Sequence, residues 1–223
     1  MFKSISLKLL FAVSVLSLLA ACAGPAKHVD YTTFRNNRPS SILVLPPVND
    51  TTDVNATNSM LSQVTMPLAE AGYYVIPVAL AEETFKQNGL NSPAEIAQVD
   101  PAKLRSIFGA DAVLYTKVTQ YGSVYQLIDS TTIVSASAKL VSLKSGDVLW
   151  QGEGRATGKE IGMNVNVGIG IIGTLVQAAV KQVAHNMADE AHDVAGLTSQ
   201  RLLSAGRPNG LLYGPRSPKY KTD

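Results

Sequence analysis

The chain has 223 residues, which is enough to bury one sizeable hydrophobic core. Its 19 Lys and Arg residues nearly balance its 17 Asp and Glu residues. Nucleic acid is therefore a poor partner, because binding to phosphates needs a surplus of cations on one face. The single cysteine excludes an intrachain disulfide, so packing alone must stabilise the fold.

The N-terminal residues have the order of an export signal. Lys3 and Lys8 precede the apolar run 9–21, which is shorter than the roughly 20 residues that a membrane-spanning helix needs. The run ends in Leu19-Ala-Ala-Cys22, which resembles the lipobox of bacterial lipoproteins. An ordinary secretory signal and a buried N-terminal helix are the alternatives. We expect cleavage before Cys22 and attachment of acyl chains such as palmitate to this residue.

Cleavage would also remove the small excess of positive charge. Without Lys3 and Lys8, 17 basic residues remain against 17 acidic ones, so the acyl chains must hold a neutral domain at the membrane. The remaining cations near the two ends of the mature chain are Lys27, Arg35 and Arg38, and Arg207, Arg216, Lys219 and Lys221. Both groups could contact anionic lipid or a protein partner, although a solvated tail is the simpler interpretation.

The segment after Cys22 predicts a tether followed by a buried strand. Residues 22–40 show no hydrophobic period and contain Gly, Pro and Asn, which is typical of a flexible linker. The apolar run 41–45 stops at two prolines and predicts a strand, and the Asn- and Asp-rich residues 48–58 predict a loop.

Helices and one further strand are expected between this loop and the middle of the chain. Pro67 should kink or break the first helix. Ser92-Pro-Ala-Glu95 has the form of a capping box, and Asp100-Pro101 begins another helix that ends at Gly109. The expected elements are a helix over 57–71, a strand over 73–76, a helix over 79–88 and two short helices after residues 92 and 100.

From Ala112 onward the pattern changes to that of strands. The segments are 112–118, 124–128, 131–143 and 148–154, with a hairpin turn at 144–147. Polar and apolar residues roughly alternate over 135–143, which predicts a strand with one buried face and one solvent-exposed face. Trp150 should anchor the hairpin to a helix.

The expected fold class is α/β (α+β), with a mixed sheet from βαβα units, an antiparallel meander and a long C-terminal helix. The first two strands and the strand at Ala112 should be parallel. The last helix is expected over 171–204. The domain boundaries follow as a signal peptide over 1–21, an anchor and tether over 22–40, a single domain over 41–205 and an irregular tail over 206–223.

The apolar stretch 165–180 is the candidate oligomer interface. Burial in the core and contact with the membrane surface are the alternatives, since exposed apolar patches of this size are rare in monomers. The interface residues would be Val165, Val167, Ile169, Ile171, Ile172, Leu175 and Val176. Gly168-Ile-Gly-Ile-Ile-Gly173 matches a dinucleotide fingerprint, but it opens the last helix, so close packing explains it better.

The sequence predicts no catalytic residue, metal or cofactor. His28, His185 and His192 have few companion donors, and solvated histidines are the expected state. No Gly-x-Ser-x-Gly motif is present. The loop 49–55 could hold calcium or form part of an enzyme site, but it lacks the glycine and closing glutamate of an EF-hand.

Several sequence segments together resemble one family of bacterial lipoproteins, which is known from a meningococcal genome-derived antigen. They are Ile42-Leu-Val-Leu-Pro-Pro47, 67–77, Gly109-Ala-Asp-Ala-Val-Leu-Tyr115, 143–152 and Gly214-Pro-Arg-Ser-Pro-Lys-Tyr220. The resemblance implies an outer-membrane lipoprotein, often encoded beside a curli-secretion-channel-like lipoprotein. It also implies a fold similar to the N-terminal domain of TolB. No catalytic residues are attached to the family.

Two functional hypotheses follow. The first is an outer-membrane lipoprotein that acts as a non-catalytic interaction or structural module of the envelope and forms a homodimer. One form of this hypothesis makes it an accessory of a curli-like secretion assembly. Ala23 supports the outer membrane, because aspartate after the lipidated cysteine is associated with inner-membrane retention; the periplasmic face and the cell surface both stay open. The second is a periplasmic hydrolase or ligand-binding enzyme with a deep polar pocket near 49–55.

Overall fold

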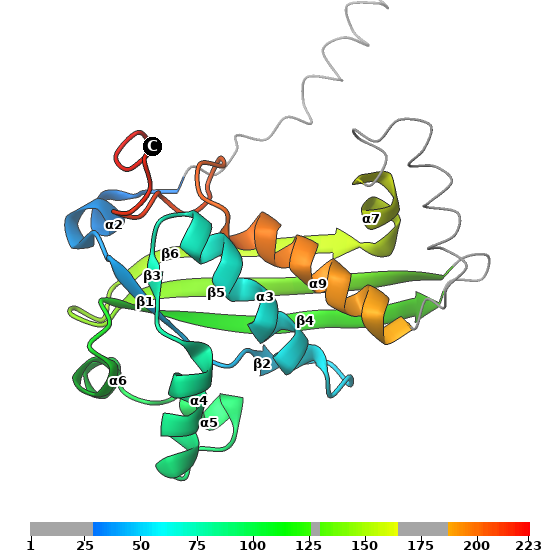
Figure 1. The fold of residues 1–223 in the computed structure, drawn as a ribbon, viewed down its shortest axis with the longest axis horizontal. Coiled ribbons are helices and arrows are strands. Elements are labelled where there is room, and N and C mark those ends of the chain that lie inside the picture. Colours follow the sequence, from blue (N-terminus) through cyan, green and yellow to red (C-terminus); the bar gives the residue numbers. More distant parts are fainter. Residues whose placement is uncertain (1–28, 126–129, 165–186) are drawn as a thin grey trace, which may run out of the picture.

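A six-stranded mixed sheet organises the molecule (Figure 1). The computed structural model describes residues 29–125, 130–164 and 187–223. The strands are β1 (Ser41–Val44), β2 (Val48–Asn49), β3 (Tyr74–Val75), β4 (Ala112–Tyr125), β5 (Ser130–Ser142) and β6 (Val148–Thr157). Their order is β3-β1-β4-β5-β6, with β2 also paired to β4. The pairs β1–β3 and β1–β4 are parallel and β4–β5–β6 is an antiparallel meander, which confirms the predicted fold class.

The helices pack on both faces of the sheet. They are α2 (Thr32–Asn37), α3 (Ala56–Glu70), α4 (Val78–Gln87), α5 (Pro93–Ile96), α6 (Pro101–Phe108), α7 (Gly158–Asn164) and α9 (Met187–Leu203). In Figure 1, α3 and α9 cross one face of the sheet, while α4, α5 and α6 gather at the end where β1 lies. Within the described residues, no helix combines the length and the apolar character needed to cross a membrane.

Two hydrophobic clusters follow from the alternation of side chains along the strands. Leu114 on β4 and Leu140 on β5 are buried against α3 and α9 in the larger cluster. Val113 faces the other way and packs with Phe85 of α4 and Leu104 of α6 in the smaller cluster. β1 contributes to both clusters, which explains why its sequence is a continuous apolar run.

The local signals place several element ends correctly. The Asp100 side chain accepts hydrogen bonds from Ala102 N (2.8 Å) and Lys103 N (3.3 Å), and Gly109 ends α6 in the left-handed conformation. Ser92 precedes α5 but makes no side-chain cap bond. The expected break at Pro67 is absent, because α3 continues through this residue, which lies in its last turn.

The predicted tether is too long, because residues 29–40 belong to the folded domain. Phe34 in α2 is only 3% exposed and packs in the larger cluster. The Tyr31 hydroxyl donates a hydrogen bond to Gly210 O at 2.6 Å. A six-residue helix shows no hydrophobic period, and both contacts reach partners far along the chain, so local sequence could not reveal them.

The C-terminal tail is irregular but packed, not solvated. Leu211 is 1% exposed and belongs to the larger cluster. The backbone of Gly214 donates to Ala71 O at 2.8 Å, and the Trp150 indole donates to Asn209 O at 3.0 Å. The hydrogen bond of Trp150 therefore ties the hairpin to the tail, whereas a helix was the expected partner.

Asp111 connects the start of β4 to the start of β1. Its Oδ2 accepts hydrogen bonds from N and Oγ of Ser40 (2.9 and 2.6 Å) and from N and Oγ of Ser41 (both 3.0 Å). Partial burial by itself would raise the pKa of this carboxyl, but the hydrogen bonds outweigh burial and hold the pKa below its ordinary value. The carboxylate therefore stabilises the fold above the pKa of the unfolded chain, and this stability is lost as pH falls through the folded pKa.

The substitution Asp111→Asn is expected to lower the free energy of unfolding at neutral pH by about 1 kcal/mol, because the hydrogen bonds to this charged group are only partly buried and solvent screens them. The loss relative to wild type should begin to shrink below roughly pH 4, where the carboxyl of the unfolded chain becomes protonated. It should be smallest below the lower pKa of the folded carboxyl. Urea denaturation at neutral and acidic pH measures both effects. Asp193→Asn, at an exposed position on α9, is the control; an equal loss in both variants would contradict the role of Asp111.

Candidate interaction surface

One face of the β4–β5–β6 meander carries polar side chains that the described helices leave open to solvent. Side chains directed to this face alternate with those buried under α3 and α9, as the pattern over 135–143 predicted. Near α4 and α6, side chains on this side such as Val113 are buried in the smaller cluster, and farther along the strands they are exposed or half-buried. This surface, the open face, consists of Tyr115, Lys117, Thr119, Ser135, Ser137, Lys139, Gln151, Glu153 and Arg155.

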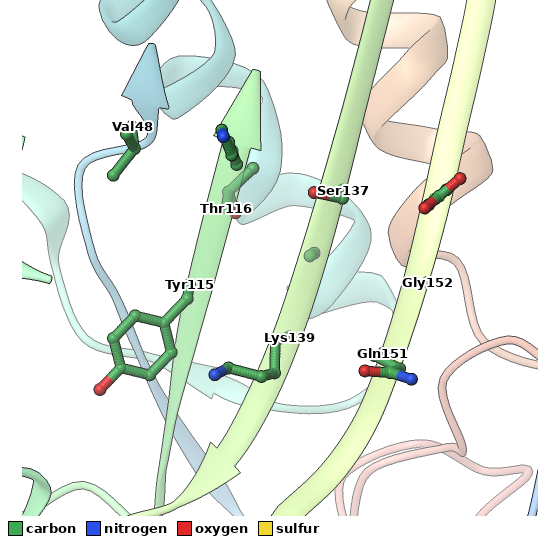
Figure 2. A pocket seen from close by; sticks show the side chains of 10 residues that line it. Val48, Tyr115, Thr116, Ser137, Lys139, Gln151 and Gly152 are labelled. Carbon is green, nitrogen blue, oxygen red and sulfur yellow. The ribbon is translucent and has the colours of Figure 1, made fainter. Parts of the chain in front are cut away.

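Residues of the open face stand in cross-strand rows because the register of the meander aligns them. Tyr115 lies opposite Lys139, which lies opposite Gln151, and Figure 2 shows the three side chains at one level. The Lys139 ammonium is 5.4 Å from the centre of the Tyr115 ring. Such a cation–π contact orients the lysine and leaves its charge available to a partner.

The next row surrounds a shallow hollow. Lys117 lies opposite Ser137, which lies opposite Glu153. The small Ser137 side chain at the centre leaves a depression of about 650 Å³ between the longer side chains. Lys117 also pairs with Asp50 next to β2, with 2.8 Å between Nζ and Oδ2. Positive and negative groups therefore alternate across the hollow.

A third row extends the open face toward the far end of the strands. The ladder slips between Val118 and Gln120, so Ser135 lies opposite Gln120 and Arg155. Ser135 Oγ donates to Gln120 Oε1 at 2.9 Å, and Thr119 Oγ1 donates to Ser135 O at 3.2 Å. A second depression of about 360 Å³ lies here. The face is thus a broad, polar and shallow stripe.

Tyr115 is the open-face side chain with a shifted pKa. Burial raises the pKa of its phenol above the ordinary value, and the negative charge of Asp100 adds to the effect. The phenol therefore stays neutral at physiological pH and can donate a hydrogen bond to a partner. The charged groups of the face are Lys117, Lys139, Glu153 and Arg155.

The loop 49–55 uses its polar groups on itself. Asn49 Oδ1 accepts from N and Oγ1 of Thr51 (2.9 and 2.8 Å), and Asp53 Oδ1 accepts from Asn55 N at 2.8 Å. Asn49 Nδ2 donates to Asp53 O at 2.7 Å. These side chains hold the loop rather than converge on a ligand. Within the described residues, the side-chain bonds of this loop therefore do not support the enzyme site that the second hypothesis places there.

His192 corrects the expectation of solvated histidines. Its half-buried ring lies between α9 and α3, with Nδ1 2.9 Å from Ser59 Oγ and Nε2 2.7 Å from Gln63 Nε2. It is a link between two helices on the covered side of the sheet. In the part of the chain that the structure describes, no cluster of three His, Cys, Asp or Glu side chains is placed to bind a metal ion.

The residues predicted from sequence to carry function lie mainly outside the described residues. These are Cys22 and the interface candidates Val165, Val167, Ile169, Ile171, Ile172, Leu175 and Val176. His28 and His185, which were expected to be solvated, also lie outside them. Sequence alone did not identify the open face. Its only local signal is the alternation over 135–143, which predicts a wet face without indicating whether another element covers it.

Comparison with known proteins gives the same family as the resemblance found in the sequence. Residues 29–216 match the family described as "Putative lipoprotein GNA1162-like". The protein named "Putative lipoprotein NMB1124/NMB1162", from Neisseria meningitidis serogroup B (strain ATCC BAA-335 / MC58), is 48% identical over 203 residues, covering 91% of this chain and 93% of that protein. The crystal structure of lipoprotein GNA1162 from Neisseria meningitidis is 50% identical, with a TM-score of 0.51, and the match covers 65% of this chain and 98% of that chain.

Proposed function

Since the chain belongs to the GNA1162-like lipoprotein family, we propose that it is a non-catalytic interaction module, held at the outer membrane by acylated Cys22. Membership of a lipoprotein family implies a membrane-anchored envelope protein. We further propose that this membrane is the outer membrane, because the residue after the cysteine is Ala23 and not aspartate.

The open face is the observation that carries the interaction role. Small-molecule sites are usually concave and mostly apolar, so that they bury most of the ligand. The open face is instead shallow, polar and mixed in charge, which suits a protein surface with complementary charges. Tyr115 and Arg155 are of the residue types enriched at the centres of such interfaces.

Two partners are proposed for the module. The first is a curli-secretion-channel-like lipoprotein, which the family resemblance suggests, and it would occupy the open face. The second is another copy of this chain, joined through the apolar stretch 165–180. The mass of the purified protein in solution tests the homodimer: a strictly monomeric protein would contradict it.

Crosslinking in intact cells tests the open face. A photoreactive residue in place of Ser137, at the centre of the hollow, is expected to capture an envelope protein that mass spectrometry identifies. Met66 on α3 is the matched control position, because its side chain is 56% exposed on the opposite side of the sheet. Equal capture from both positions, or capture only from position 66, would show that the open face is not the binding surface.

The substitution Lys139→Glu is expected to reduce this capture at least tenfold, because it reverses a charge in the row that borders the hollow, and like charges across an interface cost several kcal/mol. The crosslinked product from position 137 gives the measurement. Lys86→Glu on α4 is the control, since Lys86 is exposed and contributes only a surface pair with Glu82. Unchanged capture in the Lys139 variant would show that the charge of Lys139 does not contribute to binding of the partner.

A further inference from the structure

Basic side chains from the two ends of the described chain lie together on one surface. In Figure 1, α2 lies beside the tail that ends the chain. Val29 N donates to Asn209 Oδ1 at 3.1 Å, and the Tyr31 hydroxyl donates to Gly210 O at 2.6 Å. These bonds join segments about 180 residues apart. The basic surface so formed consists of Arg35, Arg38, Arg207, Arg216, Lys219 and Lys221, all exposed.

Tyrosine rings position several of these cations. The Arg216 guanidinium lies 5.3 Å from the centre of the Tyr74 ring, which is 48% exposed, and the Arg35 guanidinium lies 5.9 Å from that of Tyr31. Lys219 and Lys221 lie over Tyr213 and Tyr220, at 5.7 and 5.2 Å. An aromatic ring orients a cation without neutralising it, so these groups can still bind an anion.

A hollow of about 220 Å³ lies within the basic surface, between α2 and the tail. Arg35 and Arg38 line it from one side and Lys221 from the other. Asp223 also lines it: its side chain accepts a hydrogen bond from Tyr213 N at 2.6 Å, and its O accepts one from Arg35 at 3.3 Å, so its negative charge offsets only part of the charge of the three cations. Cations converging on a hollow with tyrosine walls suit a phosphate group. Tyrosine also favours the boundary between lipid and water.

The position of Cys22 limits how far the basic surface can lie from the membrane. Val29, which is bonded to Asn209 in this surface, follows Cys22 by seven residues. A fully extended chain spans at most 3.3–3.6 Å per residue, so acylated Cys22 lies within about 25 Å of Val29. A protein partner would have to enter this narrow gap, whereas the lipid surface is already there.

We propose that the basic surface docks on the anionic phospholipid headgroups of the membrane that holds Cys22, with a lipid phosphate in the hollow between α2 and the tail. This inference rests on the proposed anchoring. Docking would fix the orientation of the domain at the membrane, which attachment through one acylated residue does not.

Vesicle binding of the unacylated protein separates this surface from the acyl anchor. The Cys22→Ser chain starting at residue 22, which keeps every described residue, is mixed with vesicles of phosphatidylcholine alone or with added phosphatidylglycerol. We expect binding to the anionic vesicles only, and its loss at high salt because salt screens surface charges. Inorganic phosphate is tested separately at constant ionic strength: binding of phosphate at low millimolar concentration, together with no binding to either kind of vesicle, would assign the hollow to free phosphate and overturn lipid docking.

The double variant Lys219→Gln, Lys221→Gln is expected to lower the partition coefficient roughly 25-fold, since each cation near an anionic surface contributes about fivefold. The matched control is Lys86→Gln, Lys103→Gln, which removes two exposed cations from α4 and α6. Equal binding to both kinds of vesicle, or an equal loss in both double variants, would overturn the proposal. Circular dichroism checks that both variants fold. Because the chain lacks the acylated cysteine, the outcome does not depend on whether Cys22 is lipidated.

Discussion

Replacing Gly72 with alanine is expected to lower the free energy of unfolding by about 2–5 kcal/mol, one of the largest effects of any single substitution in the described domain. Gly72 has φ of +96°, a conformation that costs other residues energy. A Cβ atom there would also lie 2.9 Å from Gly214 O and in contact with Ser217 N. Both neighbours are backbone atoms, so neither can move away without displacing the tail.

The matched control is Gly89→Ala. Gly89 has φ of +77°, but no atom lies within 4 Å of the added Cβ, so this variant carries the backbone strain alone, about 1–2 kcal/mol. Urea denaturation measures both losses. Limited proteolysis should show the tail released first in the Gly72 variant, because the bond from Arg216 N to Gly72 O (3.0 Å) joins these two segments. Equal losses in the two variants would show that the close packing of the tail contributes little.

Replacing Cys22 with alanine is expected to give an unlipidated, mislocalised precursor. The domain should keep its stability, because both hydrophobic clusters are built from residues 31–212. Without the thiol no acyl chain can be attached, so the signal peptide over 1–21 stays on the chain and the lipid-anchored mature form is lost. Cell fractionation gives the membrane-bound share, and mass spectrometry of the mature N-terminus shows whether Cys22 is acylated.

A paired variant, Ala23→Asp, tests which membrane receives the protein without changing its acylation. It is expected to stay acylated and membrane-bound but to move toward the inner membrane, because aspartate after the lipidated cysteine is associated with retention there. Two results would contradict the anchoring proposal. One is a free Cys22 thiol in the wild-type protein, and the other is a mature chain that begins elsewhere.

Local sequence signals predicted those parts of the fold that local interactions determine. Asp100 and Gly109 bound α6 because a side-chain cap and a left-handed glycine act within a few residues. The apolar run at β1 and the alternation over 135–143 likewise reflect the environment of each strand. The class of sheet followed from these elements and their order.

The parts that could not be predicted depend on contacts between distant segments. Phe34 is buried because the tail and the sheet surround α2, and nothing within residues 22–40 indicates that. For the same reason, the two small groups of basic residues look unrelated in the sequence but form one surface in the structure. The open face was only half predictable. The alternating sequence shows that one face of the strands is polar, but it does not show whether another element of the described chain covers that face.

The pairing of residues 29–31 with residues 209–210 has a consequence for how an exported chain matures. A chain that crosses the membrane N-terminus first delivers α2 early, while its partner segment in the tail arrives last. The meander β4–β5–β6 is contiguous in sequence and can form as it emerges. Phe34 and Tyr31 can pack only after nearly the whole chain has emerged, so the segment next to the proposed lipid anchor would be the last to become resistant to proteases.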